Sequence, residues 1–222
     1  MLGRVAAIGG LISAVAAIAA ALPATGGPPL VGLTYYVVQP DPRLCPSPLC
    51  GGYWAALANR GRTRCHDGLL RPRCYMAKAV DEERHPWPSR LPGGALVRAD
   101  IEPWSFEAFG KLGVLVVAEV WAPAGRAPAS GGFYRLRDTG VRCIRAPCFW
   151  LRASKLHGSS RVTVSDLDLA ATRATPEELV RAEAALRTKS GLFAQGRIVA
   201  TADGGRLFRA TRVFLRVATP RA

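Results

Sequence analysis

Apolar and polar residues alternate, or apolar residues form short runs between turn residues, along most of the chain beyond residue 33. This pattern is typical of β-strands that bury one face. A hairpin is also predicted between Cys65 and Cys74, because Asp67-Gly68 is a favoured turn dipeptide. The pattern therefore predicts a mainly β protein. The strands are expected at 35–38, 53–59, 75–80, 95–101 and 114–121, and again at 133–137, 149–156, 161–169, 192–198 and 208–214.

One helix is expected among these strands. The sequence from Thr175 to Glu178 is a capping box with proline at the first helical position. Leu179, Ala182 and Leu186 then form an apolar stripe at helical spacing. We predict a helix over about 176–189.

Two other segments depart from the strand pattern. Residues 104–111 are predicted to form one or two helical turns, which makes the fold mainly β, or α+β by one or two short helices. Residues 81–94 contain three prolines and are predicted to be a surface loop.

The strand, cysteine loop and strand at the start of the pattern occur twice. Tyr36 and Tyr134 are 98 positions apart, and so are Cys45 and Cys143. The later strands can be aligned in the same way, so we predict two related β-rich halves.

The first half is placed at 30–124 and the second at 131–218, with a linker rich in Ala, Pro and Gly between them. Each half alone would expose sheet edges and bury a small core. We therefore expect the halves to pack about a pseudo-two-fold axis as one compact body, and the pattern leaves a barrel and a sandwich both open.

Residues 1–24 resemble an export signal. Arg4 precedes an apolar run without charge at 5–22, and small residues suited to cleavage follow. An uncleaved anchor is the alternative, although the run is barely long enough to span a bilayer. We expect a secreted or periplasmic protein without a transmembrane segment after cleavage.

Export decides how the six cysteines are interpreted. An even number of cysteines in an exported chain favours disulfides over metal ligation. Six cysteines allow fifteen pairings, and the duplication narrows them because each half contains its own Cys-x4-Cys. We predict the pairs Cys45–Cys50, Cys65–Cys74 and Cys143–Cys148. Rings this short contribute about 2 kcal/mol each, and they mainly stiffen loops.

The net charge of +14 comes from 30 basic and 16 acidic residues, and the basic residues are spread along the chain. We interpret them as a solvated basic surface. Such a surface attracts polyanions weakly and in a salt-dependent manner. This is not a sign of specific nucleic-acid recognition.

Groups that could perform catalysis or bind a metal are few. The three histidines lack metal-ligand spacing and there is no Gly-x-Ser-x-Gly, so we expect no metal, no cofactor and no enzyme activity. His66-Asp67 is interpreted as turn chemistry. The carboxylates Asp100, Asp166 and Asp168 leave an exported hydrolase as one alternative.

Certain loop residues are predicted to contact a partner. The leading hypothesis is an exported, non-enzymatic binding or structural module of the cell envelope or exterior, whose partner is an unidentified macromolecule. A protease inhibitor that presents a stiff loop is the other alternative. The candidate interaction residues are Arg43, Pro46, Ser47, Pro48, Leu49, Arg142 and Arg145.

The cysteine-loop motifs resemble those of an uncharacterised family of exported bacterial proteins that is common in myxobacteria and known only as a domain of unknown function. The resemblance covers most of residues 34–217. It implies secretion and disulfides, and it supplies no activity and no catalytic residues. The residues that carry it are Tyr35 to Val38, Asp41, Arg43, Cys45, Pro48 to Tyr53, Asn59, Cys65, Asp67-Gly68, Cys74-Tyr75, Gly140 to Cys143 and Ala146 to Cys148.

Overall fold

The computed structural model of the protein describes residues 33–218. The predicted export signal at 1–24 lies outside the described residues, as do 219–222. Within the described part, none of the helices has the length and the apolar character needed to cross a membrane.

The first half forms five main strands and one small hairpin. They match the predicted strand positions, with β6 and β7 longer than expected. The strands are β1 (Thr34–Pro40), β2 (Tyr53–Leu57), β3 (Thr63–Arg64), β4 (Leu70–Arg71), β5 (Cys74–Val80), β6 (Ala95–Phe106) and β7 (Gly110–Ala124), with β3 and β4 forming the hairpin.

The main strands of the first half close into a ring. β1 pairs with β2 and β6, β2 pairs with β5, and β6 pairs with β7, all in the antiparallel sense. A parallel pairing of β5 with β7 completes the ring. If the five main strands are numbered 1 to 5 along the chain, leaving out the hairpin strands β3 and β4, the order around the ring is 1-2-3-5-4-1. This is the strand order of the OB-fold, a five-stranded Greek-key barrel. We call this set of strands the first ring.

The second half contains six strands and one α-helix. They are β8 (Gly132–Asp138), β9 (Leu151–Lys155), β10 (Arg161–Val164), β11 (Asp166–Asp168), α1 (Pro176–Leu186), β12 (Leu192–Ala200) and β13 (Arg206–Arg216), with short 3-10 turns at Glu107–Phe109 and Ala170–Thr172.

The second half has the same order of pairing. β8 pairs with β9 and β12, β9 with β10, and β12 with β13. β11 runs parallel to β13, and only Ser165 separates β10 from β11, so the two short strands together occupy the third position of the ring. The pairing of β6 with β7 shifts by one residue between Arg98 and Ala99, and the pairing of β12 with β13 shifts in the same way between Gln195 and Gly196. We call this set the second ring.

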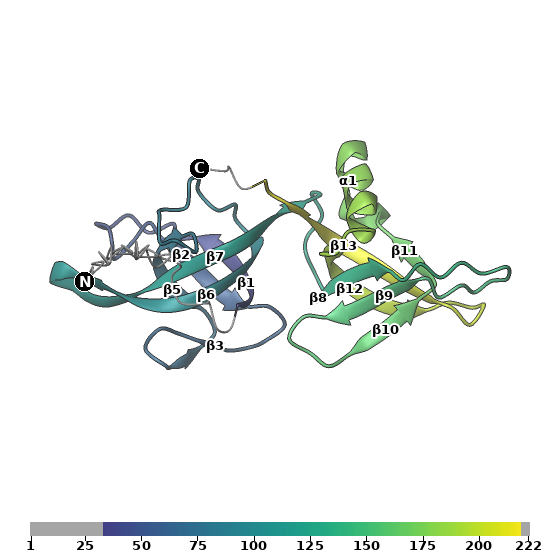
Figure 1. Ribbon diagram of the computed structural model, residues 1–222, viewed down its shortest axis with the longest axis horizontal. Coiled ribbons are helices and arrows are strands. Elements are labelled where there is room, and N and C mark those ends of the chain that lie inside the picture. Colours follow the sequence, from purple (N-terminus) through teal and green to yellow (C-terminus); the bar gives the residue numbers. More distant parts are fainter. Residues whose placement is uncertain (1–32, 219–222) are drawn as a thin grey trace, which may run out of the picture.

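One strand pairing joins the two rings into a continuous eleven-stranded sheet. At the ends of β7 and β13, Trp121 lies opposite Arg216 and Pro123 lies opposite Phe214. Figure 1 shows the result as two lobes side by side along the long axis of the molecule, with β7 and β13 running between them. Mainly β architecture with ring closure therefore confirms the predicted fold class.

Each ring has its own core, because alternate residues of every strand point inward. The first core contains Val38, Met76 and Val97, and the second contains Leu136, Leu151 and Phe208. α1 covers the second ring and buries Ala182 and Leu186, two of the three residues in its predicted stripe.

A third apolar cluster lies between the rings, and we call it the seam. Trp121 and Phe193 meet with ring centroids 4.5 Å apart, and Tyr35 packs on Phe193 at 5.2 Å. Aromatic pairs at these separations add about 0.5–1.5 kcal/mol beyond the area that they bury. The buried residues of the seam are Ala58, Leu96, Trp121, Leu156, Phe193 and Phe214, and the partly buried Tyr35, Val37 and Phe133 pack against them.

Two polar side chains clamp the seam in a reciprocal way. Asn59, which follows β2, donates from Nδ2 to the carbonyl oxygens of Phe133 and Leu156 at 2.7 and 2.9 Å, and its Oδ1 accepts from Phe133 N at 2.7 Å. His157 follows β9 in the same manner. Its Nε2 accepts from Tyr35 N at 3.2 Å and lies 3.0 Å from Tyr35 O. Each clamp thus bonds the first strand of the other ring.

Both clamps adopt a left-handed backbone conformation, with φ of 57° at Asn59 and 54° at His157. Asparagine and histidine are among the residues that tolerate this region best. The conformation turns the chain sharply after the strand and aims the side chain across the seam.

Some sequence predictions about the elements were wrong. Residues 104–111 are not helical turns, because β6 continues to Phe106 and pairs with β7 as far as Gly110, and only three residues between them form a 3-10 turn. The helix ends at Leu186 and not at 189. The predicted strand 161–169 divides at Ser165, whose backbone and hydroxyl both bond Arg206, because the chain there changes from pairing with β9 to pairing with β13.

The seam is expected to make stability depend on pH. Burial lowers the pKa of His157 below its usual 6.5, and the charge of Arg60 lowers it further. The unfolded chain therefore binds a proton more readily than the native protein, so stability is present above about pH 6.5 and is lost as the pH falls below it. In His157→Asn, the melting temperature should change less between about pH 7.5 and 5.5 than in the wild type, as followed by circular dichroism.

Asparagine is the matched replacement because it tolerates the left-handed conformation and is used at the corresponding place in the other half. His85→Asn is the control, since that ring is exposed and lies away from the seam. An equally steep pH dependence in the wild type and in His157→Asn would contradict the prediction.

Removing the other clamp should lower stability directly. Asn59→Gly keeps the left-handed backbone and deletes three hydrogen bonds across the seam, so the free energy of unfolding should fall by about 1–3 kcal/mol in urea titration. Asn59→His, which introduces the residue of the other clamp, should be milder. A value for Asn59→Gly within about 0.5 kcal/mol of the wild type would show that the clamp contributes nothing.

Candidate functional site: the two disulfide-clasped loops

The six cysteines pair as predicted. The α-carbons of Cys45 and Cys50 are 5.3 Å apart, those of Cys65 and Cys74 5.4 Å, and those of Cys143 and Cys148 5.5 Å. These separations are in the normal range for disulfides. The second bridge is buried in the first core, whereas the other two close the loops between the first two strands of each ring. We call residues 41–52 the first clasped loop and 139–150 the second.

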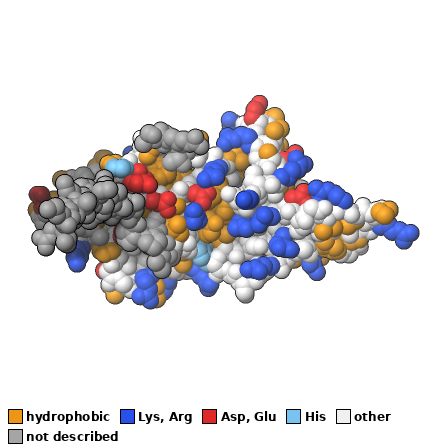
Figure 2. Space-filling model, viewed as in Figure 1, with side chains coloured by type: hydrophobic (Ala, Val, Ile, Leu, Met, Phe, Trp, Pro, Cys, Tyr) orange, Lys and Arg blue, Asp and Glu red, His pale blue; other side chains and the backbone are white. Residues whose placement is uncertain are grey.

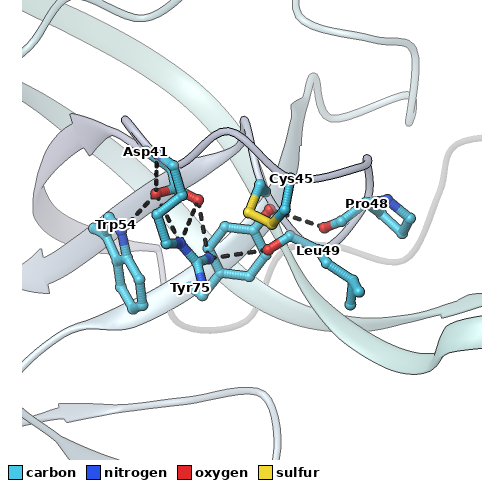
Figure 3. A network of polar contacts seen from close by, with 8 residues as sticks. Asp41, Cys45, Pro48, Leu49, Trp54 and Tyr75 are labelled. Atoms are coloured by element: carbon cyan, nitrogen blue, oxygen red, sulfur yellow. Dashed lines mark hydrogen bonds and ion pairs between the residues drawn. A yellow bond between two sulfur atoms is a disulfide. The ribbon is translucent and has the colours of Figure 1, made fainter.

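A buried carboxylate holds the first clasped loop at its base. Asp41 is 2% exposed, and its Oδ1 accepts from Trp54 Nε1 at 3.2 Å. Arg43 Nε donates to both carboxylate oxygens at 3.0 Å, and its NH2 donates to Leu49 O at 3.0 Å. In Figure 3 Asp41 and Trp54 lie on one side of the network, and Cys45, Pro48 and Leu49 of the loop lie on the other. The ion pair therefore fixes the position of the loop.

Hydrogen bonds from the Arg43 side chain are the largest influence on the pKa of Asp41. Together with hydrogen bonds from the Arg43 backbone and from Trp54, they hold this pKa below the usual 3.8, although burial raises it. Asp41 is therefore ionised at any pH at which the protein is expected to work. Its negative charge is paired with Arg43 at the base of the loop.

Aromatic rings support the same loop from below. The Arg43 guanidinium lies 5.2 Å from the ring centroid of Trp54 and 5.0 Å from that of Tyr75. Tyr75 also donates from its hydroxyl to Pro48 O at 2.8 Å, and Arg73 covers Trp54 at 4.7 Å. Both rings come from neighbouring strands, β2 and β5, on the outer face of the first ring. The loop is braced by a disulfide, an ion pair and an edge-to-face aromatic pair, Trp54 with Tyr75.

The second clasped loop has a simpler brace. Arg142 donates NH1 and NH2 to the two oxygens of Asp138 at 3.0 and 2.8 Å. Hydrogen bonding from Arg142 and from Gly140 N lowers the pKa of Asp138 to about 2. The Trp150 indole donates to Ser165 O at 2.9 Å and anchors the end of the loop.

The candidate interaction residues fall into two groups. Arg43 and Arg142 are tied to carboxylates and support the loops. Pro46, Ser47, Leu49 and Arg145 are exposed, and Pro48 is half-buried.

Sequence reasoning missed two exposed side chains beside the cysteines. Leu44 precedes the first bridge and Ile144 lies inside the second, and both are fully exposed, at 102% and 103%. It also missed the aromatic support of Trp54 and Tyr75. The position of Leu44 and Ile144 next to a cysteine was the one signal in the sequence for their exposure. The contacts of Trp54 and Tyr75 depend on how the loop folds back, which no local pattern indicates.

The candidate catalytic carboxylates have local roles. Asp166 and Asp168 accept from backbone nitrogens one and two residues ahead, and Asp168 also pairs with Arg209. Asp100 accepts from the backbone of Ile101. Asp67 accepts a hydrogen bond from Leu69 N, two residues ahead, which is typical of aspartate in a turn, and it forms an ion pair with Arg71. In residues 33–218 no three His, Cys, Asp or Glu side chains come together as a metal site.

The brace of the first loop makes a testable prediction. Asp41→Asn removes the charge that holds Arg43, so the free energy of unfolding should fall by about 1.5–3 kcal/mol in urea titration, and limited proteolysis at 44–49 should become faster. Asp81→Asn is the control, because that carboxylate serves an exposed turn. Unchanged stability together with unchanged cleavage would contradict the proposed role of Asp41.

Comparison with known proteins gives one match. Residues 34–220 match the family described as Domain of unknown function (DUF6748), which covers both rings and both clasped loops. No curated protein and no solved structure matches the chain. Because the match spans most of the sequence, the chain belongs to the DUF6748 family.

Proposed function

We propose that the protein is an exported, non-enzymatic binding module of the bacterial cell envelope or exterior, and that it holds another macromolecule through its two clasped loops. Three disulfides support a location outside the cytoplasm, since disulfides persist in oxidising compartments. The export signal expected at 1–24 agrees with that location.

The observation that carries the proposal is the exposure of Leu44 and Ile144. Each is a large, fully exposed aliphatic side chain, and each lies next to a cysteine whose disulfide closes its loop. Val141 and Leu49, at 47% and 43% exposure, extend the apolar surface of the two loops. Exposed aliphatic side chains on a stiff loop offer apolar surface that another molecule can cover.

The braces explain why such loops are suited to binding. A flexible loop loses conformational freedom when it docks, at a cost of about 0.5–1.5 kcal/mol for each immobilised side chain. The disulfides and the ion pairs of Arg43 and Arg142 impose that order before binding. More of the interaction energy then appears as affinity.

We further propose that the halves are a duplication packed about a pseudo-two-fold axis. The common strand order and the matching register shifts support it. The register between β7 and β13 supports the axis too. When the two halves are aligned by sequence, Trp121 corresponds to Phe214 and Pro123 corresponds to Arg216. In the sheet, Trp121 pairs with Arg216 and Pro123 pairs with Phe214, so each of the two β7 residues pairs with the counterpart of the other. This exchange is the pattern of a two-fold contact.

The arrangement of the loops suggests a bridging role. In Figure 1 the loop after β1 lies toward one end of the long axis, and the loop between β8 and β9 lies at the other end. Two contacts at opposite ends can join two sites on one polymer or on two neighbouring molecules. Linked contacts of this kind increase avidity without any new interaction.

The protease inhibitor is the weaker alternative. Pro46 to Leu49 form a turn closed by a hydrogen bond from Leu49 N to Pro46 O at 3.1 Å. A protease binds its substrate as an extended strand, and this closed turn does not offer one. The absence of inhibition in titrations against serine and cysteine proteases would remove this alternative.

The proposed function predicts that the loop tips are needed for binding and dispensable for folding. The double variant Leu44→Ser/Ile144→Ser should lose retention on isolated cell envelopes in a co-sedimentation assay, while its melting temperature stays unchanged because both side chains are already exposed. The control is Leu70→Ser/Val180→Ser, which removes two exposed aliphatic side chains outside the loops. Equal retention of the two double variants would contradict the proposal.

A further inference from the structure

A basic groove lies on the outer face of the second ring, at the foot of the second clasped loop. It is an open cavity of about 710 Å³. Its lining includes cations from three neighbouring strands or their ends, namely Arg135, Arg137, Arg152, Lys155 and Arg161. Figure 2 shows Lys and Arg side chains spread over the visible face of this half of the molecule.

The strand pattern places these cations together. Leu136 and Leu151 point into the second core, so Arg137 and Arg152 beside them point outward. The pairing of β8 with β9 sets Arg137 directly opposite Arg152. Pairing with β10 brings Arg161 opposite Ser154, which itself faces Arg135. Backbone register therefore fixes the positions of the four arginines.

The charges of the groove are not compensated within the described residues. None of the five cations forms an ion pair with a carboxylate of residues 33–218. The carboxylate in the lining, Asp138, is held by Arg142. Like charges directly opposite one another across strands are destabilising. The groove thus has an electrostatic cost that a bound anion would remove.

The corresponding face of the first ring is different. There Gln39 lies opposite Trp54, at the places that Arg137 and Arg152 occupy in the second ring. The nearby Arg43 covers Trp54 and is neutralised by Asp41. The basic groove is therefore a property of one half, and the overall charge of the chain does not explain it.

The lining also indicates the kind of anion. Arginine presents a planar fork that binds a carboxylate or a phosphate through two parallel hydrogen bonds, and four of the five cations are arginine. Bases of single-stranded nucleic acid require exposed aromatic rings for stacking. The aromatic side chains of the lining are Tyr35 and His157, and both are engaged in the seam.

We propose that this groove binds a carboxylate-bearing polysaccharide, a polymer of uronic acids. On a strand the α-carbons of residues two apart are about 6.8 Å apart, and residues opposite one another on neighbouring strands are about 5 Å apart, so the backbone supports several cations within reach of a chain of carboxylates. The proposal goes beyond the proposed function, because it names a ligand class for a site apart from the apolar loop tips.

Isothermal titration calorimetry of the oxidised, exported protein with polygalacturonate tests the proposal. Arg137→Gln/Arg152→Gln should weaken binding about tenfold or more, because two charged hydrogen-bonding groups are lost. Arg90→Gln/Arg126→Gln is the matched control: both side chains are exposed, the loss of charge is the same, and affinity should change less than about twofold. Neutral dextran and polythymidylate, at equal ionic strength, are the comparison ligands.

Each outcome decides the matter. Equal weakening in the two double variants would show general charge attraction and overturn the proposal. So would the absence of polygalacturonate binding, or binding of polythymidylate at least as tight as that of polygalacturonate. Leu44→Ser/Ile144→Ser should still bind polygalacturonate, so failure of the loop proposal and failure of the groove proposal are distinguishable.

Discussion

At the seam, Asn59 of the first ring and His157 of the second each bond the backbone of the other ring's first strand, around the aromatic contact of Trp121 with Phe193. A single five-stranded ring of this size buries a small core, and β7 and β13 would each expose an edge if they were separated. The seam removes both problems. It buries aromatic surface between the rings and pairs the two strand ends, so that the molecule becomes one sheet with two closed rings.

This arrangement determines what can serve function. Because the interiors of the rings are filled, binding surfaces must lie on loops and on outer strand faces. The first clasped loop is stiffened by Asp41 and Arg43, and the outer face beneath it is used for that support. On the second ring the loop relies on Asp138 and Arg142, which leaves its outer face free to carry the basic groove. Two halves with the same strand order thus differ in how they use the same face.

Much of the fold could be predicted from the sequence, because period-two alternation and turn residues are local signals. The capping box at Thr175 and the pairing of each Cys-x4-Cys were equally local. The prediction failed at 104–111 because two strands that pair with each other can extend beyond their apolar stretch. It also could not predict ring closure, since the parallel pairing of β5 with β7 joins distant segments.

The candidate site was predicted only in part for the same reason. Arg43 and Arg142 were predicted to contact a partner, whereas their ion pairs with Asp41 and Asp138 depend on how each loop folds back and could not be predicted. The basic groove could not be predicted from the sequence, because its cations come from three strands that become neighbours only when the strands pair.

Differential scanning calorimetry of the oxidised protein tests the central claim, that the seam makes the two rings one cooperative unit, most directly. The account predicts a single unfolding transition whose calorimetric and van't Hoff enthalpies agree. Two separate transitions, or a calorimetric enthalpy well above the van't Hoff value, would show that the rings unfold independently and would contradict it.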